Sequence, residues 1–463
     1  MPSNQHYDAI VIGSGQGGTP LCRALAEAGK HTALVERVHV GGTCINEGCT
    51  PTKTMIASGR VAYLARRGAD YGVKTGAVHI EMSRVRKRKR DIVTSFRSGN
   101  EKRIKDTANL DLIFGEASFT DANSITVRPA KGKPLALTAD QFFINAGTRP
   151  AIPPLQGLAD VPYLNSTSIM ELGEVPKHLL VLGGGYVGLE FGQLFRRLGS
   201  RVTVINRGSQ LLSYEDPDVA EAVAQILKED GIQIFLNANT ESVSKQKKQI
   251  TLKVRTAGKL RTLTGSHLLV GTGRVPNSDT LSLSAAGVAT DDKGFIRAND
   301  KLQTNVPHIF ALGDIKGGPA FTHISYDDFR ILRTNVINKG NASIANRMVP
   351  YTVFIDPQLG RIGMTEQEAK EQGRKIRVAK MPMSYVARAL EVDEPRGFMK
   401  AIVDRDSDQI LGAAVLGIEG GEIMSQIQLA MMGKLSYRVL QDAVFAHPTL
   451  SESLNNLFAH FQD

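Results

Sequence analysis

The sequence predicts an α/β protein that contains two Rossmann-like domains. The first observation is a glycine motif, Gly13–Ser14–Gly15–Gln16–Gly17–Gly18, which follows the apolar segment Ala9–Ile12. The second is a repeat of this arrangement, in which Leu179–Leu182 runs into Gly183–Gly184–Gly185–Tyr186–Val187–Gly188. The third is the length of 463 residues, which allows roughly three domains at about 150 residues each.

Each glycine motif is followed by the helix and the second strand of a dinucleotide-binding βαβ unit. The second strands are expected at Thr32–Val35 and Arg201–Ile205. In this unit the first glycine forms the tight turn, the second lets the backbone approach a pyrophosphate, and the third lets the helix pack on the strand. The residues expected to bind the two dinucleotides are therefore Gly13, Gly15 and Gly18 at one site and Gly183, Gly185 and Gly188 at the other.

The residues that end the second strands distinguish the two ligands. Glu36 ends the first, where a carboxylate accepts hydrogen bonds from the hydroxyls of an unphosphorylated ribose. Asn206 takes the matching place in the second copy and is followed by Arg207. No carboxylate opposes a 2′-phosphate there and a cation is available, which favours NADPH, with NADH possible. The alternative is that Arg207 only points to solvent.

Three cysteines occur, and two of them form a close pair. Cys44 and Cys49 lie in the segment Gly41–Lys53, and such a pair in a chain without an export signal indicates redox or metal chemistry. There is no second cysteine pair to complete a metal site, so none is predicted. Cys49 precedes Thr50, a candidate N-cap, and Pro51, which suits a first helical position. A thiolate near this helix start should have a lowered pKa.

Composition excludes several other classes of protein. Hydrophobic residues make up 42% of the chain and charged residues 22%, close to ordinary globular usage. No apolar run reaches the 18 or more residues of a membrane span, and Met1–Tyr7 is polar without a signal-peptide pattern. A disulfide scaffold, a membrane protein, a coiled coil and a disordered chain are therefore excluded, and a cytoplasmic location is expected. Cys22 is expected to be a small buried hydrophobe.

The net charge of +10 is concentrated in one segment. Between Arg84 and Lys105 there are 10 basic and 2 acidic residues. This run is consistent with a nucleic-acid or polyanion surface, or with a solvated helix face. Met82, Val85, Ile92, Val93 and Phe96 recur at near-helical spacing and would form the buried stripe of such a helix. No aromatic residues interleave with the charges, so the solvated face is favoured and no nucleic-acid partner is expected.

Five motifs in order give the chain a family resemblance. It resembles the class I pyridine nucleotide–disulfide oxidoreductases, the flavoproteins that include glutathione reductase, lipoamide dehydrogenase and mercuric reductase. The motifs are Gly13–Glu36 for the ADP part of FAD, Gly41–Lys53 for a redox disulfide, Gly183–Glu190 for NAD(P), Thr304–Asp314 for the FAD ribitol and His447–Glu452 for acid–base chemistry.

The resemblance implies a division of the chain into four segments. Residues 1–147 would form the first part of an FAD domain, 148–272 an NAD(P) domain, 273–343 the second part of the FAD domain, and 344–463 a C-terminal α+β dimerisation domain. Gly/Pro-rich crossings at Ala146–Pro150 and Gly271–Pro276 bracket the second glycine motif. Tyr351–Ile355 is expected to be a strand of the last domain.

The resemblance also implies residue roles. Cys49 would contact the flavin and Cys44 would face the substrate. Lys53 would pair with Glu190 beside the flavin, and Tyr186 would cover the flavin until nicotinamide arrives, the alternative being a core residue of the turn. The further residues implied at the FAD site are Gly42, Thr43, Lys53, Gly147, Arg274 and Asp314.

His447 and Glu452 are the candidate proton-transfer pair. Glu452 lies five residues after His447, past Pro448, which permits the carboxylate to reach back to the imidazole. In the family this pair comes from the partner subunit, so a homodimer is implied. His323 is a candidate for the substrate path, with packing as the equal alternative.

The electron acceptor is predicted from the branch of the family that the chain resembles most. Resemblance is strongest to the branch of mercuric reductase and the reactive-chlorine-resistance flavoprotein of bacteria, the latter credited with copper(II) reduction, although that relative ends its second strand in an acid and this chain has Asn206. Metal-ion reduction at Cys44 and Cys49 is therefore expected first. No cysteine follows Cys49, unlike mercuric reductases, which carry a C-terminal pair. A lipoamide dehydrogenase or another small-disulfide reductase is the alternative.

Overall fold

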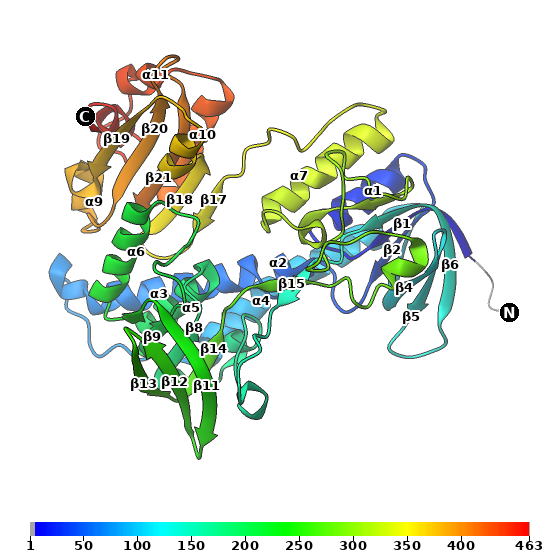
Figure 1. The fold of residues 1–463 in the computed structure, drawn as a ribbon, viewed down its shortest axis with the longest axis horizontal. Helices are drawn as coiled ribbons and strands as arrows, with labels where there is room; N and C mark the ends of the chain where they lie inside the picture. The colour runs from blue at the N-terminus through cyan, green and yellow to red at the C-terminus, as the bar shows by residue number, and fades with distance from the viewer. Residues whose placement is uncertain (1–4, 463) are drawn as a thin grey trace. The chain divides into compact units, whose positions relative to one another are not determined.

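The computed structural model describes residues 5–462. These residues form two compact units, each assembled from separate stretches of chain (Figure 1). Unit one contains the chain up to Thr54, Arg84–Ala151 and Gly273–Arg347. Unit two contains Met55–Ser83, Ile152–Thr272 and the chain from Met348 onward. The four-segment division expected from the sequence stays a prediction.

Unit one is built on a seven-stranded sheet whose parallel part has the order β3-β2-β1-β6-β16. The antiparallel strands β5 and β4 extend it from the start of β6. The strands are β1 (Gln5–Ile12), β2 (Thr32–Glu36), β3 (Leu110–Phe114), β4 (Glu116–Asp121), β5 (Ser124–Arg128), β6 (Leu135–Ile144) and β16 (Ile309–Ala311), with a separate antiparallel pair β7 (Thr148–Pro150) and β15 (Arg274–Pro276).

Strand β1 lies in the centre of this sheet and is buried on both faces. Ile10 and Ile12 pack into one hydrophobic cluster, whereas Ala9 and Val11 pack into another. Because successive side chains of a strand point to opposite faces, these clusters are the cores on the two sides of the sheet. The helices of this unit are α1 (Gly18–Glu27), α2 (Gly42–Asn46), nearly all of α4 (Met82–Lys105) and α7 (Thr322–Leu332), and the first residues of α3 (Cys49–Arg66) also belong to it.

Unit two contains a second parallel sheet with the order β10-β9-β8-β14. An antiparallel sheet, β11-β12-β13, shares its core through Leu180, Leu182 and Leu252. The strands are β8 (His178–Leu182), β9 (Arg201–Ile205), β10 (Gln233–Phe235), β11 (Ala238–Gln246), β12 (Gln249–Thr256), β13 (Lys259–Gly265) and β14 (His267–Val270), and the helices are α5 (Tyr186–Leu198) and α6 (Pro217–Glu229). The α/β class with two dinucleotide-binding folds is thereby confirmed.

The last part of unit two is an antiparallel sheet with the order β17-β18-β21-β20-β19-β22. Its strands are β17 (Tyr351–Val353), β18 (Gln358–Gly363), β19 (Ile376–Pro382), β20 (Phe398–Asp404), β21 (Ile410–Gly417) and β22 (Phe461–Gln462). Helix α10 packs on β18 and β21. The helices here are α8 (Glu366–Glu371), α9 (Ala387–Glu391), α10 (Gly420–Met432), α11 (Tyr437–Asp442) and α12 (Ser453–Leu457).

A buried ion cluster joins the C-terminal sheet to the start of α6. Lys400 of β20 is 2% exposed, and its ammonium group lies 3.1 Å from Asp216, 3.0 Å from Asp218 and 2.7 Å from Glu366. Burial opposes ionisation of Asp218, but hydrogen bonds from Lys380 and Lys400 outweigh it and lower the pKa of this carboxyl. Glu366 behaves in the same way, because hydrogen bonds from Lys370 and Lys400 outweigh burial and lower its pKa.

Two local expectations need correction. The strand expected at Tyr351–Ile355 ends at Val353, because the Phe354 and Asp356 backbone N–H groups donate to Glu190 and Gln193 instead of to a neighbouring strand. The basic segment does form helix α4, with Met82 and Val93 buried, but Phe96 is 52% exposed and is not part of the buried stripe. Within residues 5–462, no helix has both the length and the apolar character that crossing a membrane requires.

Candidate active site

The first glycine loop connects β1 to α1 and is too tight for any larger residue. Gly13 has φ +98°, and a Cβ on it would lie 2.4 Å from the Asn145 carbonyl oxygen. A Cβ on Gly15 would lie 2.7 Å from the Asn145 side chain, and a Cβ on Gly18 only 2.1 Å from the Gly13 carbonyl oxygen. The glycine backbone at this helix start therefore allows the close approach that a bound pyrophosphate requires.

Asn145 is the residue that holds this loop in place, and sequence reasoning missed it. Its side-chain oxygen accepts a hydrogen bond from Gly18 N at 2.9 Å, and its amide nitrogen donates to the Leu312 carbonyl at 2.8 Å. Asn145 directly follows β6 and is 6% exposed. A polar residue at the carboxyl end of a central parallel strand was the signal that pointed to it.

Glu36 lies at the end of β2, against the same loop. Its carboxylate accepts hydrogen bonds from Ser14 N at 3.0 Å and from the Ser14 hydroxyl at 2.5 Å. Val38 N donates to its other oxygen at 2.9 Å. The carboxylate is therefore fixed beside the glycine loop, at the place where the ribose of a bound dinucleotide would lie.

Asp314 belongs to a second polar group in unit one. The Thr148 hydroxyl donates to Asp314 at 3.2 Å, and Arg274 donates to both the hydroxyl and the carbonyl of Thr148 at 2.7 Å. Burial raises the pKa of Asp314 above its ordinary value, although Arg274 and Thr148 act in the opposite direction. Gly147, one residue before Thr148, has φ +66° and open space where a Cβ would be.

The cysteine pair lies across the junction between α2 and α3. Cys44 is in α2 and is half-buried, whereas Cys49 is exposed and begins α3. The helix thus starts two residues earlier than expected, with Cys49 and not Pro51 as its first residue, so Thr50 is not its N-cap. Gly42 packs so closely that a Cβ on it would lie 2.6 Å from Gly15 Cα, and Thr43 beside it is exposed. Both cysteines are free thiols in this structure.

The two sulfur atoms of this pair interact with each other and with one hydroxyl group. A hydrogen bond with Cys49, together with burial, raises the pKa of the Cys44 thiol, and Thr322 acts in the opposite direction. The Thr322 hydroxyl lies 3.4 Å from Cys49 Sγ. Thr322 begins α7 and was not singled out in the sequence, where His323 was the candidate. The exposed ring of His323 stacks on Phe321 at a centroid distance of 5.4 Å.

The second glycine loop in unit two repeats the geometry of the first. Gly183 has φ +109°, and a Cβ on it would lie 2.3 Å from the Gly271 carbonyl oxygen. A Cβ on Gly188 would lie 2.5 Å from the Gly183 carbonyl oxygen, whereas Gly185 faces open space. Tyr186 begins α5 and is 37% exposed, so the alternative of a core residue is wrong. The open backbone at Gly185 fits a pyrophosphate here as well.

Asn206 ends β9 and lies against this second loop. Its side-chain oxygen accepts from Gly184 N at 3.1 Å, and its amide nitrogen donates to the Gln210 carbonyl at 2.7 Å. Arg207, the next residue, is exposed. The partner of Gly184 N is thus an amide oxygen, whereas the partner of Ser14 N in the first loop is the Glu36 carboxylate.

Glu190 and Lys53 were expected to pair. Glu190 is 3% exposed in α5, and its carboxylate accepts a hydrogen bond from Phe354 N at 2.9 Å. Lys53 is half-buried in the first turns of α3. The two residues belong to different units, and their pairing stays a prediction.

His447 and Glu452 are in contact in the C-terminal part of unit two. The two carboxylate oxygens of Glu452 lie 2.8 and 3.0 Å from His447 Nδ1. The imidazole is exposed, and its Nε2 remains available for a proton. The use of this histidine in the partner's active site stays a prediction.

The remaining sequence candidates are explained by packing and charge. Cys22 is fully buried in α1, and burial raises the pKa of its thiol to about 12. Lys89 of α4 is only 4% exposed, so part of the basic run is not at the surface. Among residues 5–462, no three His, Cys, Asp or Glu side chains are grouped so as to hold a metal ion.

Comparison with known proteins covers nearly the whole chain. Residues 7–328 match the family described as pyridine nucleotide-disulphide oxidoreductase, and residues 349–458 match the dimerisation domain of that family. The second match indicates a homodimer.

Individual relatives agree with the family matches. The chain is 37% identical to the probable pyridine nucleotide-disulfide oxidoreductase RclA of Escherichia coli (strain K12), over 98% of this chain and 99% of the relative. It is 34% identical to a mercuric reductase of Lysinibacillus sphaericus, over 98% and 82%, and 31% identical to a dihydrolipoyl dehydrogenase of Geobacillus stearothermophilus, over 96% and 94%.

A solved structure extends the likeness to the fold. The copper(II) complex of the HOCl-induced flavoprotein disulfide reductase RclA from Escherichia coli matches with a TM-score of 0.90 and 36% identity, over 98% of this chain and 99% of that one. The chain therefore belongs to the pyridine nucleotide-disulphide oxidoreductase family, as a flavoprotein disulfide reductase of the RclA and mercuric reductase type that uses FAD and NAD(P)H.

Proposed function

We propose that the protein oxidises NADPH and passes the electrons through Cys44 and Cys49 to a metal ion of the copper(II) or mercury(II) type. The observation that carries the proposal is the cysteine pair, in which one sulfur is exposed, the other is half-buried and both are free thiols. Soft thiolates are preferred ligands of copper(I) and related ions. A relative that is named as a mercuric reductase and a similar protein that was solved as a copper(II) complex support the same choice.

The residues proposed to hold the cofactors form two sets. Gly13, Gly15, Gly18 and Glu36 would hold the ADP part of FAD, with Gly42, Thr43, Lys53, Gly147, Arg274 and Asp314 as further contacts. Gly183, Gly185, Gly188, Asn206 and Arg207 would hold NADPH. When bound, FAD supplies the two-electron redox chemistry that links the nicotinamide to the cysteine pair.

Within the cysteine pair, the surroundings of the two sulfurs differ. The hydrogen bond with Cys49, together with burial, raises the pKa of Cys44 and so disfavours its thiolate. Cys49 lies in the first turn of α3, where the helix dipole favours a thiolate. Cys44 therefore needs a base before it can bind a metal ion or attack a disulfide.

His447 of the partner subunit is the base that we propose for Cys44. Glu452 holds Nδ1 of this imidazole, which orients the ring and leaves Nε2 to take the proton. Two electrons from one NADPH then reduce two copper(II) ions to copper(I), or one mercury(II) ion to the metal.

Tyr186 is proposed to cover the flavin face until NADPH arrives, and Lys53 with Glu190 to flank it. The cytoplasm is the proposed location.

A low-molecular-weight disulfide is the second candidate substrate. The His447–Glu452 contact favours it, because an oriented imidazole suits proton transfer to a leaving thiolate. A dihydrolipoamide dehydrogenase would use this pair in the same way, and would prefer the NAD⁺/NADH couple.

Oxygen-free NADPH oxidation with different acceptors separates these functions. The acceptors are copper(II), mercury(II), glutathione disulfide and lipoamide, and the variants are Cys44→Ser and Cys49→Ser. Cys22→Ser is the matched control, since Cys22 is buried in α1. Fast turnover with a metal ion, lost in both active-site variants and kept in the control, is expected. Turnover with lipoamide alone would contradict the metal proposal. Full activity of Cys44→Ser or Cys49→Ser would exclude the cysteine-pair mechanism.

A further inference from the structure

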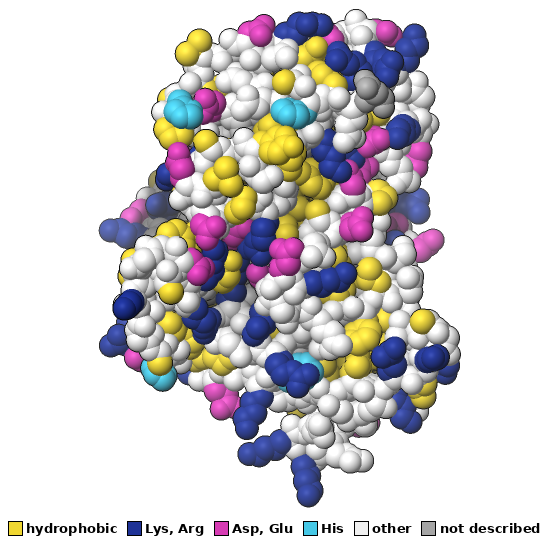
Figure 2. Space-filling view, turned by 90° about the vertical axis from the view of Figure 1, so that its left-hand side faces the viewer, with side chains coloured by type: hydrophobic (Ala, Val, Ile, Leu, Met, Phe, Trp, Pro, Cys, Tyr) yellow, Lys and Arg dark blue, Asp and Glu magenta, His cyan; other side chains and the backbone are white. Residues whose placement is uncertain are grey.

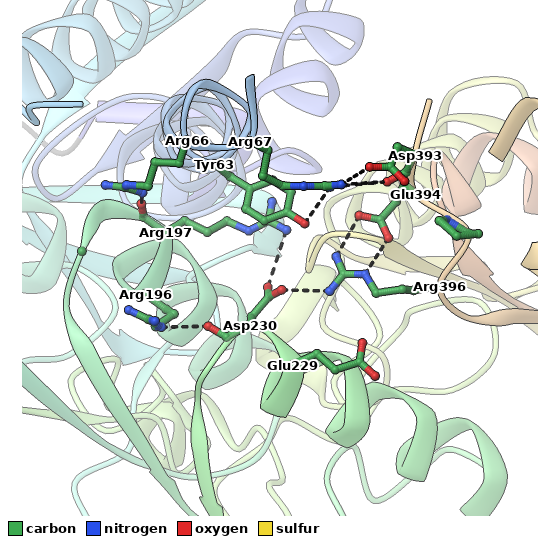
Figure 3. Close-up of a pocket in the computed structure, with 12 residues that line it drawn as sticks. Tyr63, Arg66, Arg67, Arg196, Arg197, Glu229, Asp230, Asp393, Glu394 and Arg396 are labelled. Carbon is green, nitrogen blue, oxygen red and sulfur yellow. Dashed lines mark hydrogen bonds and ion pairs between the residues drawn. The ribbon is translucent and has the colours of Figure 1, made fainter. Parts of the chain in front are cut away.

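A cavity of about 530 Å³ lies within unit two, at the C-terminal ends of α3, α5 and α6. Figure 3 shows the side chains around it. Such a volume falls within the range of small-molecule sites. The lining residues are Tyr63, Arg66, Arg67, Arg196, Arg197, Gly199, Glu229, Asp230 and the loop 393–396. Five arginines are thus gathered around one hollow, which is an unusual density of guanidinium groups.

Three of these arginines are neutralised by carboxylates. Arg67 pairs with Asp70 and Asp393, and Arg396 lies 2.6 Å from Glu394 and 2.8 Å from Asp230. Arg197 pairs with Asp356 and is 6% exposed. On the face shown in Figure 2, Lys and Arg side chains likewise mingle with Asp and Glu side chains across the middle. The guanidinium groups of these three arginines are therefore already paired and are part of the framework.

Arg66 and Arg196 differ from the other three. In the described part of the chain, each bonds only backbone carbonyls: Arg66 donates to the Arg197 carbonyl, and Arg196 donates to Asp230 and Ser200 at 2.8 and 3.3 Å. A guanidinium group has five N–H donors, so most of their donors are uncommitted. The two helix ends that they cap carry about half a negative charge each, and Glu229 adds one further negative charge to the lining, so the proposal rests on the uncommitted donors and not on a surplus of charge.

Two buried polar atoms near these arginines also lack partners. Arg197 Nε and Ser200 Oγ have no hydrogen-bond partner among the described residues. Ser200 is fully buried and follows Gly199, which lines the cavity. In Figure 3, Arg66 and Arg196 lie on one side of the view, and Glu229, the lining carboxylate without an arginine partner, lies toward the other.

We propose that this cavity binds a small organic oxyanion, a carboxylate or a phosphate ester, through the guanidinium groups of Arg66 and Arg196. Planar guanidinium groups bind such oxyanions through pairs of parallel N–H donors. None of the residues that line the cavity belongs to the proposed redox centre. Helix α3 runs from Cys49 to Arg66, and its 18 residues span about 27 Å. Because α3 begins at the reactive cysteine and α5 begins at the second glycine loop, a ligand here touches the far ends of both helices.

The test is calorimetric titration of the FAD-loaded enzyme with citrate and, separately, with pyrophosphate. Ionic strength is fixed with NaCl, and NADP⁺ is present at saturation so that the glycine loops are occupied. Saturable binding is expected for at least one probe, weakened about tenfold or more in Arg66→Gln and in Arg196→Gln. Arg201→Gln is the matched control, because Arg201 is exposed in the same domain and does not line the cavity.

The outcomes are distinct from those of the redox assay. Citrate binding alone identifies a carboxylate ligand, and pyrophosphate binding alone a phosphate ligand. Arg66→Lys keeps a positive charge at the helix end but lacks the paired donors, so it should remain folded and still bind weakly. The proposal is overturned if neither probe binds saturably, or if Arg66→Gln and Arg196→Gln bind both probes as well as Arg201→Gln does.

Discussion

The side-chain oxygens of Glu36 and Asn206 play the same part in the two glycine loops. Each accepts a hydrogen bond from the residue after the first glycine, Ser14 N at 3.0 Å and Gly184 N at 3.1 Å. The two positions are thus structurally equivalent, and they differ in charge. A carboxylate at one and an amide at the other give the two loops different preferences for the ribose that they meet.

Replacing Asn206 should change the coenzyme preference. In Asn206→Glu the new carboxylate would repel a 2′-phosphate and accept hydrogen bonds from ribose hydroxyls, as Glu36 is placed to do. We expect the ratio of kcat/KM for NADPH to that for NADH to fall about tenfold or more, which corresponds to about 1.4 kcal/mol. Steady-state kinetics with both coenzymes measures it. If neither Asn206→Glu nor Arg207→Gln changes this ratio, the second glycine loop does not determine the coenzyme preference.

The two glycines of α5 provide a matched pair. A Cβ on Gly188 would lie 2.5 Å from the Gly183 carbonyl oxygen, whereas a Cβ on Gly192 would meet nothing closer than 3.6 Å. Gly188→Ala should displace the loop at a cost of about 1–3 kcal/mol and weaken NADPH binding about tenfold. Gly192→Ala should leave binding unchanged and stabilise the helix by up to about 1 kcal/mol. Equal affinities of the two variants, measured by titration, would contradict this account.

Thiol labelling should separate Cys22 from the active-site pair. Burial raises the pKa of Cys22 to about 12 and removes it from solvent. At pH 8 the folded, reduced protein should therefore incorporate iodoacetamide at Cys44 or Cys49 only, and the unfolded protein at all three cysteines. Peptide mass spectrometry identifies the sites. Fast labelling of Cys22 in the folded protein would show that α1 opens readily.

The use of His447 across subunits can be tested by mixing inactive variants. His447→Gln should lower kcat by about 10²-fold or more, through loss of the base. In a hybrid dimer of Cys44→Ser and His447→Gln subunits, one of the two sites would regain both residues. Random reassociation at equal amounts should then restore about a quarter of the wild-type turnover. No recovery, with hybrid dimers present by native mass spectrometry, would place both residues in one subunit's site.

The Lys400 cluster should make stability depend on pH in a definite direction. The folded-state pKa values of Asp218 and Glu366 are lowered, so these carboxylates add stability above their unfolded pKa values, near 4. This contribution should decline below about pH 5 and be lost as the pH falls through the folded-state values.

Removing the lysine tests this account of the pH dependence. Lys400→Met removes the buried cation that the three carboxylates share, although Lys380 still bonds Asp218 and Lys370 still bonds Glu366, and it should lower the free energy of unfolding at pH 7 by about 3 kcal/mol. The variant should also lose less stability than the wild type between pH 5 and 3. Lys375→Met is the control, because that lysine and its partner Asp406 are both 75% exposed and their pair is worth less than about 1 kcal/mol. Chemical denaturation at several pH values measures the free energy of unfolding and its dependence on pH. If Lys400→Met and the wild type have the same pH dependence, the Lys400 cluster is not the source of that dependence.

The parts of the fold that the sequence predicted are those with a local signal. The glycine loops, the strands that flank them and the position of Glu36 follow from short-range periodicity and turn chemistry. Thr322 and Asn145 were missed because their partners are distant: Cys49 and Thr322 are separated by 273 residues, and Asn145 and Leu312 by 167. The arginine cavity was missed for the same reason, since its lining comes from α3, α5, α6 and the loop 393–396.

The strand β16 has a consequence for how the protein is made. It supplies residues 309–311 as a neighbour of β6, and the following residue, Leu312, accepts the hydrogen bond from Asn145. During translation the first glycine loop leaves the ribosome long before β16 and Leu312 have been synthesised. The first half of the chain therefore cannot finish its own sheet, and a fragment that ends before β16 should emerge without a competent flavin pocket. The sheet that carries the first glycine loop can therefore be completed only when the last third of the chain is being synthesised.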